Sequence, residues 1–256
     1  MAGHARRFRP RELRVERYAR LDRDRPRRIG VPEVVLGEGK SIPQLLGILR
    51  ALAARGEGAL ISRPSAAQRR ALALARRAGL PVRLLPGNRV ARLAGPLGPK
   101  YRRGTVALVT GGTSDVLLAE EAHAILSELG IRVLRAYDVG VAGLHRLLRA
   151  VEALERHRPE LYLVFAGREG ALPTVIAGLV HAPVVGVPTS VGYGRGGRGE
   201  AALTAMLQSC APIAVVNIDA AVPAALFAAQ RFAISRDGPR RSRAARRRSP
   251  RRPKRP

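Results

Sequence analysis

The 256-residue sequence contains no tryptophan, four phenylalanines and one cysteine. A single cysteine cannot form a disulfide within the chain, which excludes a disulfide-stapled fold. No apolar run reaches the roughly 18 residues that a membrane-spanning helix needs, and no apolar core follows the basic N-terminus as it would in a secretory signal. We therefore expect a cytoplasmic protein that makes no use of a membrane.

Acidic residues are scarce, since 19 Asp and Glu oppose 46 Lys and Arg, and the formal net charge is +27. The two ends, residues 1–29 and 236–256, carry 17 of these charges. The last segment (RRSRAARRRSPRRPKRP) has no apolar periodicity, so we expect a disordered tail that contacts nucleic acid only non-specifically. An arginine-rich genome explains the same charge without a function. The few aromatic residues argue against base stacking.

Residues 1–29 form a basic N-terminal segment with a weak apolar pattern. Leu13, Val15, Tyr18 and Leu21 recur at rough helical spacing. This pattern predicts a short amphipathic helix or a partly ordered arm that precedes the folded domains.

The next part of the chain, residues 30–94, has short apolar runs separated by helical patterns and predicts a small α+β domain. Ser41 is the expected N-cap of a helix over residues 42–54, with a proline in its first turn. Residues 95–103 contain two prolines and two glycines, so we interpret them as a linker.

Residues 104–235 predict an α/β domain. Its strand-length apolar runs lie at 105–110, 132–137, 161–166, 184–187 and 214–218. Helical patterns follow them, at 115–129, 141–156, 171–179, 200–209 and 222–232. Near-continuous apolar strands that alternate with helices are typical of a doubly wound parallel sheet, here of five strands. Because ligands bind beyond the carboxyl ends of such strands, we expect the functional residues in the loops that follow them.

The loop after the first of these strands combines Gly111, Gly112, Thr113, Ser114 and Asp115. Glycines let backbone N–H groups approach an anion, hydroxyls add donors, and the N-terminus of the following helix favours negative charge. We therefore predict that this loop holds a phosphate. Asp115 either caps the helix or binds a sugar hydroxyl. A plain capped turn explains the same residues.

Two further loops supply candidates for proton transfer. Glu169 lies between Gly167 and Gly170 at the end of the third strand, next to Arg168. An acid has little packing reason to be there, so Glu169 is a candidate general acid or base. His145 lies one turn into the helical pattern at 141–156, which follows the second loop (residues 137–140). It is a candidate for proton donation or phosphate binding, although a surface polar position also accounts for it.

The fourth loop, residues 188–199, contains five glycines, hydroxyl groups and two arginines. It is suited to be a mobile cationic cover over phosphates, or else it is only a flexible connection. Candidate ligand-contacting residues in this loop are Ser190, Gly192 and Tyr193. Gly167 of the third loop is another, as are Asn217 and Asp219 at the end of the last strand.

Cys210 comes just before the last strand. A free cysteine is most often a small buried thiol, and no neighbouring histidine marks a Cys–His pair. The spacing leaves a catalytic role open. The sequence contains no cluster of His and Cys residues that would indicate a structural zinc site.

Several motifs occur in a fixed order: PEVVLGEGKS, VTGGTSD, YDVGVAGLHRL, FAGREGALP, VVGVPTSVGYG, MLQSCAP and VVNID. From about residue 21 to 232 the chain thereby resembles the LarB family, which makes pyridinium-3,5-biscarboxylic acid mononucleotide for the nickel-pincer nucleotide cofactor. The C-terminal half is similar to N5-carboxyaminoimidazole ribonucleotide mutase, a PurE-like fold. In that enzyme a related loop, matching Ser114 and Asp115, holds phosphate, and a histidine, matching the region of His145, handles protons.

The resemblance implies a carboxylase and phosphoanhydride hydrolase that acts on nicotinic acid adenine dinucleotide. Carbon dioxide or bicarbonate is the implied co-substrate, and no tightly bound cofactor is expected, with Mg²⁺ left open. The implied role of Cys210 is transient addition to the pyridinium ring, with Glu169 moving a proton. Loop 111–115, Ser190 and Tyr193 would hold the nucleotide, so these groups are expected together at neighbouring strand ends. A homo-oligomer, an octamer by resemblance, is also implied.

Two other functions remain alternatives at this point. One is an aminoimidazole ribonucleotide carboxylase or mutase, against which the extra N-terminal domain and Cys210 count. The other is a non-enzymatic basic protein that binds nucleotides or RNA. The chain also departs from the family pattern, because Arg168 stands in place of a methionine and residues 220–223 in place of Asn-Gly-Phe-Gly.

Overall fold

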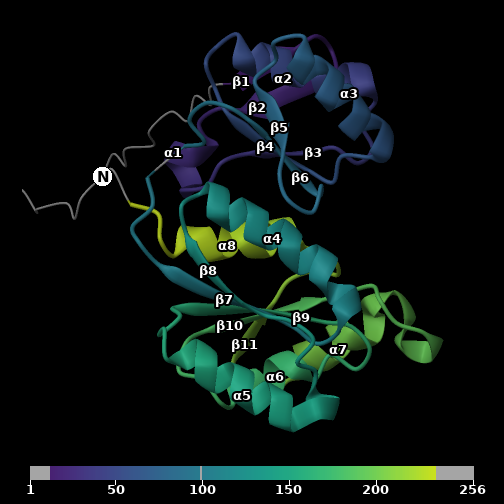
Figure 1. Cartoon of the computed structure of the whole chain (residues 1–256), viewed down its shortest axis with the longest axis vertical. Coiled ribbons are helices and arrows are strands. Elements are labelled where there is room, and N and C mark those ends of the chain that lie inside the picture. Colours follow the sequence, from purple (N-terminus) through teal and green to yellow (C-terminus); the bar gives the residue numbers. More distant parts are fainter. Residues whose placement is uncertain (1–11, 99, 235–256) are drawn as a thin grey trace, which may run out of the picture.

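The computed structural model describes residues 12–98 and 100–234, which form two domains stacked on one another (Figure 1). The predicted basic tail, residues 236–256, lies outside the described residues. Within the described ranges, no helix is long and apolar enough to cross a membrane. Each domain is built around one main β-sheet, and a helical layer separates the two sheets.

The N-terminal domain has a four-stranded sheet in the order β3-β4-β6-β5. Its strands are β3 (Val34–Leu36), β4 (Ala59–Ser62), β5 (Val82–Leu84) and β6 (Val90–Leu93). Helices α2 (Ile42–Ala53) and α3 (Ala66–Arg77) cover one face. Side chains alternate across a strand, so Ala59 and Ile61 of β4 join the core under these helices while Leu60 joins the core on the opposite face.

Both helices of this domain begin with a capping box. The hydroxyl of Ser41 accepts a hydrogen bond from the backbone N–H of Gln44 (3.3 Å), and the Gln44 side chain accepts one from the backbone N–H of Ser41 (3.0 Å). Ser65 and Gln68 repeat this arrangement for α3. The prediction of Ser41 as an N-cap is confirmed. Such a cap typically contributes about 1 kcal/mol.

Residues 12–22 form a β-hairpin, so the predicted amphipathic helix is wrong. β1 (Glu12–Val15) pairs antiparallel with β2 (Ala19–Asp22), and a short helix, α1 (Arg25–Ile29), follows. Leu13, Val15 and Leu21 are buried in the same core as helix α2. Leu13 and Val15 lie two residues apart, which is the period of a strand, and four apolar residues are too few to separate that period from a helical one. The hairpin is therefore part of the N-terminal domain and not an arm outside it.

The C-terminal domain contains a five-stranded parallel sheet, and the predicted fold class is confirmed. Its strands are β7 (Thr105–Thr110), β8 (Arg132–Ala136), β9 (Leu161–Ala166), β10 (Val184–Pro188) and β11 (Ile213–Val215). Every neighbouring pair is parallel, in the order β11-β10-β9-β7-β8. This is the flavodoxin-like order, in which the chain goes outward from the first strand to one side and then continues on the other.

Helices cover both faces of this sheet (Figure 1). α4 (Val116–Glu128) and α8 (Ala221–Gln230) lie on one face, and α5 (Leu144–Glu155), α6 (Leu172–Ala177) and α7 (Glu200–Leu207) lie on the other. Side chains of strand β9 alternate between the two faces of the sheet. Leu163 and Phe165 belong to the core under α4 and α8, and Tyr162 and Val164 belong to the core on the other face. Burial on both faces explains why the strand is apolar throughout.

The last strand is shorter than predicted, since β11 ends at Val215 and the prediction extended to residue 218. Asp219 has a φ of +56°, which a strand cannot accommodate, and its N–H returns to the carbonyl of Pro188 (2.9 Å). The chain thus turns toward β10 at residues 218–219, and residues 216 and 217 lead into this turn outside the strand. The helix predicted from residue 115 also begins differently, because Thr113–Asp115 forms a 3-10 turn ahead of α4.

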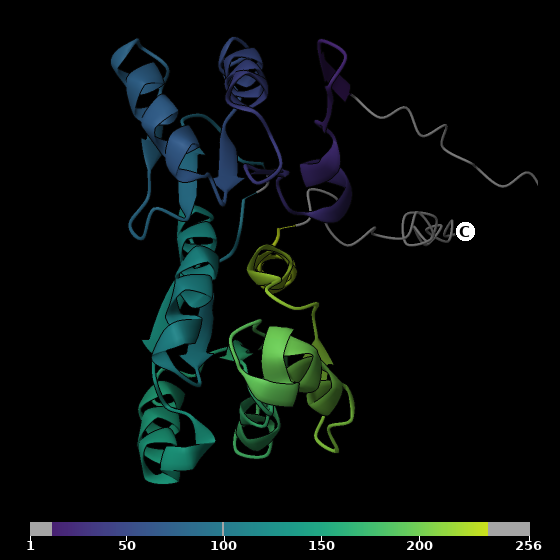
Figure 2. The same ribbon diagram turned by 90° about the vertical axis from the view of Figure 1, so that its right-hand side faces the viewer.

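Helices α4 and α8 form the layer between the two sheets, and the two views agree on this (Figures 1 and 2). Leu60 and Val90 of the N-terminal sheet belong to the same hydrophobic cluster as Ile125 of α4 and Ala225 of α8. The two domains therefore share a hydrophobic core and are not joined by the linker alone.

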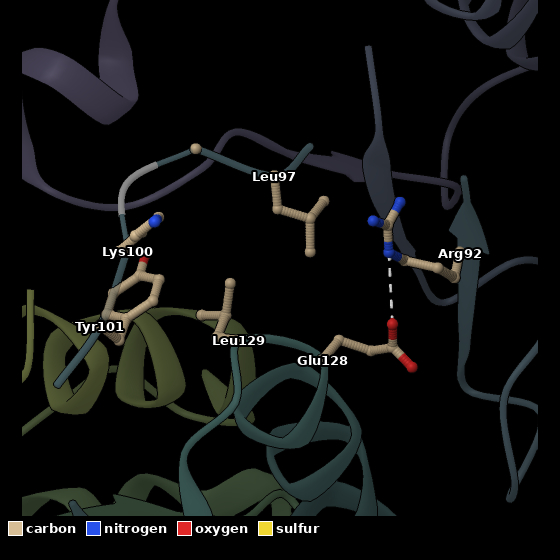
Figure 3. A pocket seen from close by; sticks show the side chains of 7 residues that line it. Arg92, Leu97, Lys100, Tyr101, Glu128 and Leu129 are labelled. Atoms are coloured by element: carbon tan, nitrogen blue, oxygen red, sulfur yellow. Dashed lines mark ion pairs between the residues drawn. The ribbon is translucent and has the colours of Figure 1, made fainter. Parts of the chain in front are cut away.

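The predicted linker runs beside the residues that follow α8. The N–H of Arg102 donates to the carbonyl of Phe232 (2.8 Å), and the N–H of Ile234 donates to the carbonyl of Lys100 (3.0 Å). A pocket of about 340 Å³ opens between this segment and the end of α4 (Figure 3). It is lined by Arg92, Leu97, Gly98, Lys100, Tyr101, Glu128 and Leu129.

The hairpin predicts a difference between two leucine variants. Leu21→Ala should lower the free energy of unfolding by about 2–3 kcal/mol, because the Leu21 side chain is buried. Leu74→Ala, on the exposed side of α3, should change it by less than about 0.5 kcal/mol. Urea unfolding of the full chain measures both. Equal small effects would mean that residues 12–22 do not pack on the domain.

Candidate active site

The loops after β7 and β9 meet at the carboxyl edge of the sheet, between the two strands where the chain order diverges. Ligand sites of doubly wound sheets form at this point. The N–H of Gly111 donates to the carbonyl of Phe165 (2.9 Å). A Cβ on Gly140 would lie 2.6 Å from the carbonyl oxygen of Gly111, and one on Gly167 would lie 2.2 Å from that of Val191. Only glycine allows these loop backbones to approach so closely.

Asp115 joins the first loop to the fourth. One oxygen of its carboxylate accepts a hydrogen bond from the backbone N–H of Gly112 (2.9 Å), and the other accepts one from the hydroxyl of Thr189 (2.6 Å). The side chain is only 4% exposed and Thr189 is fully buried. The carboxylate is thus occupied within the protein, which favours a structural role for Asp115 over direct contact with a sugar hydroxyl.

These contacts change which groups of the first loop are open to an anion. The N–H groups of Gly111 and Gly112 both donate to other parts of the chain. Thr113 and Ser114 are exposed, and they lie in the turn that leads into α4. Their hydroxyls, together with the N-terminus of the thirteen-residue helix α4, are the groups suited to a phosphate.

Burial raises the pKa of Asp115 above its ordinary value. The hydrogen bonds from Thr189 and Gly112 oppose this shift, and the negative charge of Asp219 adds to it. Asp219 is thereby linked to the same cluster. A buried carboxylate of this kind depends on its donors, because an ionised group removed from water is costly unless it is hydrogen-bonded.

The fourth loop is fixed where it leaves β10. The N–H of Thr189 donates to the carbonyl of Ala166 (3.0 Å), and the N–H of Ser190 donates to the carboxylate of Asp219 (2.8 Å). Farther along, Tyr193 is 77% exposed, and the guanidinium of Arg168 lies 4.6 Å from the centre of its ring. This cation–π contact connects the fourth loop to the third. Gly192 lies between these two attachments and is exposed.

Glu169, His145 and Asn217 all lie in loops or helix starts at the carboxyl edge, as predicted, and all three are exposed. Glu169 follows β9, between the backbones of Arg168 and Gly170, both of which have positive φ. His145 is the second residue of α5, which follows β8. Asn217 follows β11, where its side-chain oxygen accepts a hydrogen bond from the N–H of Ile218 (2.8 Å). Their chemical roles stay predictions.

Cys210 lies elsewhere. It follows α7 and precedes Ile213, which pairs with Val184 at the start of β10. Helix α7 has eight residues and carries the chain about 12 Å away from the carboxyl edge. The thiol is therefore at the amino edge of the sheet, and the expectation that one copy brings it next to Glu169 is wrong. Cys210 is exposed, so it is not a buried packing thiol.

The sequence interpretation missed two side chains at this edge. Thr189 is a buried hydroxyl whose partner, Asp115, is 74 residues away, and its only signal was its position directly after a buried strand. Arg63 of the N-terminal domain reaches the carbonyl of Asp219. Nothing in the local sequence around Arg63 indicates this contact.

Across residues 12–98 and 100–234, no group of three or more His, Cys, Asp or Glu side chains lies close enough to hold a metal ion. The pocket between the domains contains none of the predicted site residues. The carboxyl edge of the sheet, where the predicted loops converge, is therefore the candidate active site.

The fold and the loop cluster define the class: a PurE-like α/β domain preceded by an α+β domain. A family model described as AIR carboxylase matches residues 105–251, and one described as LarB/PurE-like N-terminal domain matches residues 13–78. The chain belongs to the LarB family, whose AIR carboxylase domain is of the carboxylase and mutase type. The second match starts at Leu13 and so includes the hairpin.

Two curated proteins and one solved structure are similar to the chain. An uncharacterized protein of Methanocaldococcus jannaschii is 38% identical over 84% of both chains. A probable N5-carboxyaminoimidazole ribonucleotide mutase of Methanothermobacter thermautotrophicus is 36% identical over 53% of this chain, which spans 40% of that protein. The crystal structure of PurE from Treponema denticola is 27% identical, with a TM-score of 0.40, over 50% of this chain and 78% of that one.

The Asp115–Thr189 contact predicts a pH-dependent loss of stability. Because the folded pKa of Asp115 is raised above 3.8, ionisation of this group lowers the free energy of unfolding as pH rises from 3.8 through the folded pKa. Thr189→Val removes a hydrogen bond that holds this pKa down. It should raise the pKa further, extend the fall in stability to higher pH, and cost about 2 kcal/mol at neutral pH.

Urea unfolding between about pH 3 and about pH 7 measures this effect. Thr174→Val is the matched control, because the Thr174 hydroxyl donates to the neutral hydroxyl of Ser209 (2.8 Å). That variant should lose stability equally at every pH. A Thr189→Val curve parallel to the wild-type curve would contradict the proposed coupling to Asp115.

Proposed function

We propose that this protein carboxylates the pyridinium ring of nicotinic acid adenine dinucleotide at C5 and hydrolyses its phosphoanhydride. The products are pyridinium-3,5-biscarboxylic acid mononucleotide and AMP, for the nickel-pincer nucleotide cofactor. The observation that carries the proposal is the exposed thiol of Cys210 in a chain that joins a LarB-type N-terminal domain to an AIR carboxylase domain.

The chemistry gives Cys210 a defined task. Its thiolate adds to a ring carbon of the pyridinium, and the electron pair of the broken C=N bond moves to the ring nitrogen, which makes C5 an enamine carbon. C5 then attacks carbon dioxide and forms the new C–C bond. Loss of the C5 proton to Glu169 and expulsion of the thiolate restore the aromatic ring, so no oxidant or reductant is needed. Covalent catalysis of this kind divides one inaccessible step into feasible ones.

The carboxyl edge supplies the binding groups for the dinucleotide. Thr113 and Ser114 at the start of α4 would hold a phosphate, and Ser190, Gly192 and Tyr193 would cover it. Asn217 and Asp219, after β11, would contact the substrate from the same edge, and His145 would be available for proton transfer during hydrolysis. A Mg²⁺ ion, if one assists, would be held mainly by the phosphates of the substrate.

The thiol has to come from a second copy of the chain. Strand register puts Ile213 level with Ala107 of β7, and Gly111 lies four residues farther along and three strands across. That separation is roughly 20 Å. A single ribose joins the pyridinium ring to its phosphate, which is too short a link to span it. Leu207, close to Cys210 in sequence, is 67% exposed and supports contact with a partner. We therefore propose a homo-oligomer, as the family resemblance implies.

A second candidate function is carboxylation or carboxylate transfer on aminoimidazole ribonucleotide. The AIR carboxylase match over residues 105–251 favours it. That chemistry has no use for a thiol and leaves the N-terminal domain without a role, so we place it second.

Incubation with labelled bicarbonate, followed by mass spectrometry, distinguishes the two functions. We expect the wild-type protein to convert nicotinic acid adenine dinucleotide to the carboxylated mononucleotide and AMP. Cys210→Ala and Cys210→Ser should each lower carboxylation by at least about 100-fold, because neither side chain provides a thiolate. Normal turnover by Cys210→Ala would remove the thiol mechanism. Turnover of aminoimidazole ribonucleotide alone would favour the second function.

Mixed oligomers test whether the thiol acts across subunits. Cys210→Ala and Glu169→Gln chains, each inactive alone, should regain about a quarter of wild-type activity when co-expressed with different tags and purified together, because one site in four then combines an intact acid with an intact thiol. Co-expression of Cys210→Ala with Cys210→Ser is the control and should regain none. Absence of recovery in the first mixture would mean that both groups act within one copy.

A further inference from the structure

Arg63 extends from the N-terminal domain to the candidate active site. It follows β4 directly, with a φ of +50°, which is uncommon for a residue other than glycine. Its Nε lies 3.2 and 3.1 Å from the two carboxylate oxygens of Glu121 on α4. Its Nη2 donates to the backbone carbonyl of Asp219. Glu38 lies at the outer side of the same guanidinium, with 4.0 Å between Nη1 and Oε2.

Glu121 holds this guanidinium in place. Its side chain is fully buried, and it also accepts a hydrogen bond from Arg89 (3.2 Å). A buried carboxylate is costly unless it is paired, so the position of Arg63 against α4 is strongly determined. The planar guanidinium then presents a second donor in a fixed direction, toward Asp219.

Asp219 is where this contact reaches the site. Its side chain accepts the hydrogen bond from the N–H of Ser190, the residue at which the fourth loop begins, and its own N–H donates to Pro188. Its φ of +56° is a conformation that requires support from its surroundings. The Arg63 hydrogen bond to the Asp219 carbonyl provides such support from another domain.

We propose that Arg63 is a positioning residue of the active site: through Asp219 it fixes the start of the fourth loop, so that the N-terminal domain helps to shape the substrate pocket. The role of this loop in substrate binding rests on the proposed function. The positioning itself rests only on the contacts of Arg63, Glu121, Asp219 and Ser190.

The competing explanation is that the Arg63–Glu121 ion pair only holds the two domains together. The chain contains another interdomain ion pair that serves for comparison. Arg83 of β5 pairs with Glu128 near the end of α4 (2.6 Å). This pair also joins the two domains, but it lies two helical turns from Glu121 and neither of its members contacts Asp219. Arg83→Gln is therefore a matched control for loss of an interdomain ion pair.

Hydrogen exchange of the full-length chain tests the positioning directly. In Arg63→Gln and Arg63→Lys, the amide of Ser190 should exchange at least about tenfold faster than in the wild type, and in Arg83→Gln it should not. Arg63→Lys keeps a cation beside Glu121, so it preserves the domain contact, but a lysine cannot also donate to Asp219 in the fork geometry of arginine. Unchanged exchange at Ser190 in the folded Arg63→Lys protein would overturn the proposal.

Kinetics of the same variants test the consequence for function. With whichever nucleotide the wild-type protein turns over, both Arg63 variants should raise KM by at least about tenfold with a smaller change in kcat, because the loop that holds the substrate is displaced. Arg83→Gln should retain the wild-type KM. Wild-type inactivity on the dinucleotide would refute the proposed function and leave the exchange result to decide the role of Arg63. Altered exchange with an unaltered KM would overturn the link to the pocket.

Discussion

The common direction of the five strands β7 to β11 is the constraint on which the site depends. In a parallel sheet every loop that follows a strand lies at one edge and every segment that precedes a strand lies at the other. Because the chain order diverges between β7 and β9, the helices that follow these two strands, α4 and α6, lie on opposite faces of the sheet, and ligands of such sheets bind between the two loops. The same rule that gathers Ser114, Glu169 and Ser190 at the carboxyl edge puts Cys210 at the amino edge. Under the proposed chemistry, one copy of the fold therefore supplies the binding groups and the proton-transfer groups but needs the thiol of another.

Two buried carboxylates, one directly before α4 and one in its first half, connect the edge of this sheet to the rest of the molecule. Asp115 is held by neutral donors, the Thr189 hydroxyl and the Gly112 N–H, and burial raises its pKa. Glu121, six residues along the chain, is held by two guanidinium groups from the N-terminal domain. Leaving either carboxylate without its donors in a buried position would be costly, so each contact strongly restricts the geometry of its partners. Helix α4 thus fixes the fourth loop through Asp115 and receives the N-terminal domain through Glu121.

Much of the C-terminal domain was predictable because its signal is local. The strands at 105–110 and 161–166 are buried on both faces, their apolar runs are continuous, and their predicted bounds match those observed. Contacts between residues distant in sequence were not predictable. The Thr189–Asp115 hydrogen bond and the left-handed conformation by which Arg63 reaches Asp219 produce no periodic pattern of apolar residues in the sequence. The prediction for residues 12–22 was wrong for a different reason, since the few apolar residues of this hairpin fit both the helical period and the strand period. The position of Cys210 could have been predicted from the sequence, because a residue that precedes a strand of a parallel sheet must lie at the amino edge.

The contact between Arg63 and Asp219 suggests a functional role for the N-terminal domain under the proposed function. The AIR carboxylase match begins at residue 105, so the domain before it is what this family adds to the PurE-like fold. Under the proposed function the substrate is a dinucleotide, which is larger than a ribonucleotide and carries a second nucleotide that the protein has to accommodate. An arginine that is paired with Glu121 of α4 and hydrogen-bonded to Asp219 supports the base of the fourth loop, where a small displacement would shift every residue beyond it. Under the proposed function, the added domain therefore contributes order to the pocket, and its direct contacts with the substrate need not be many.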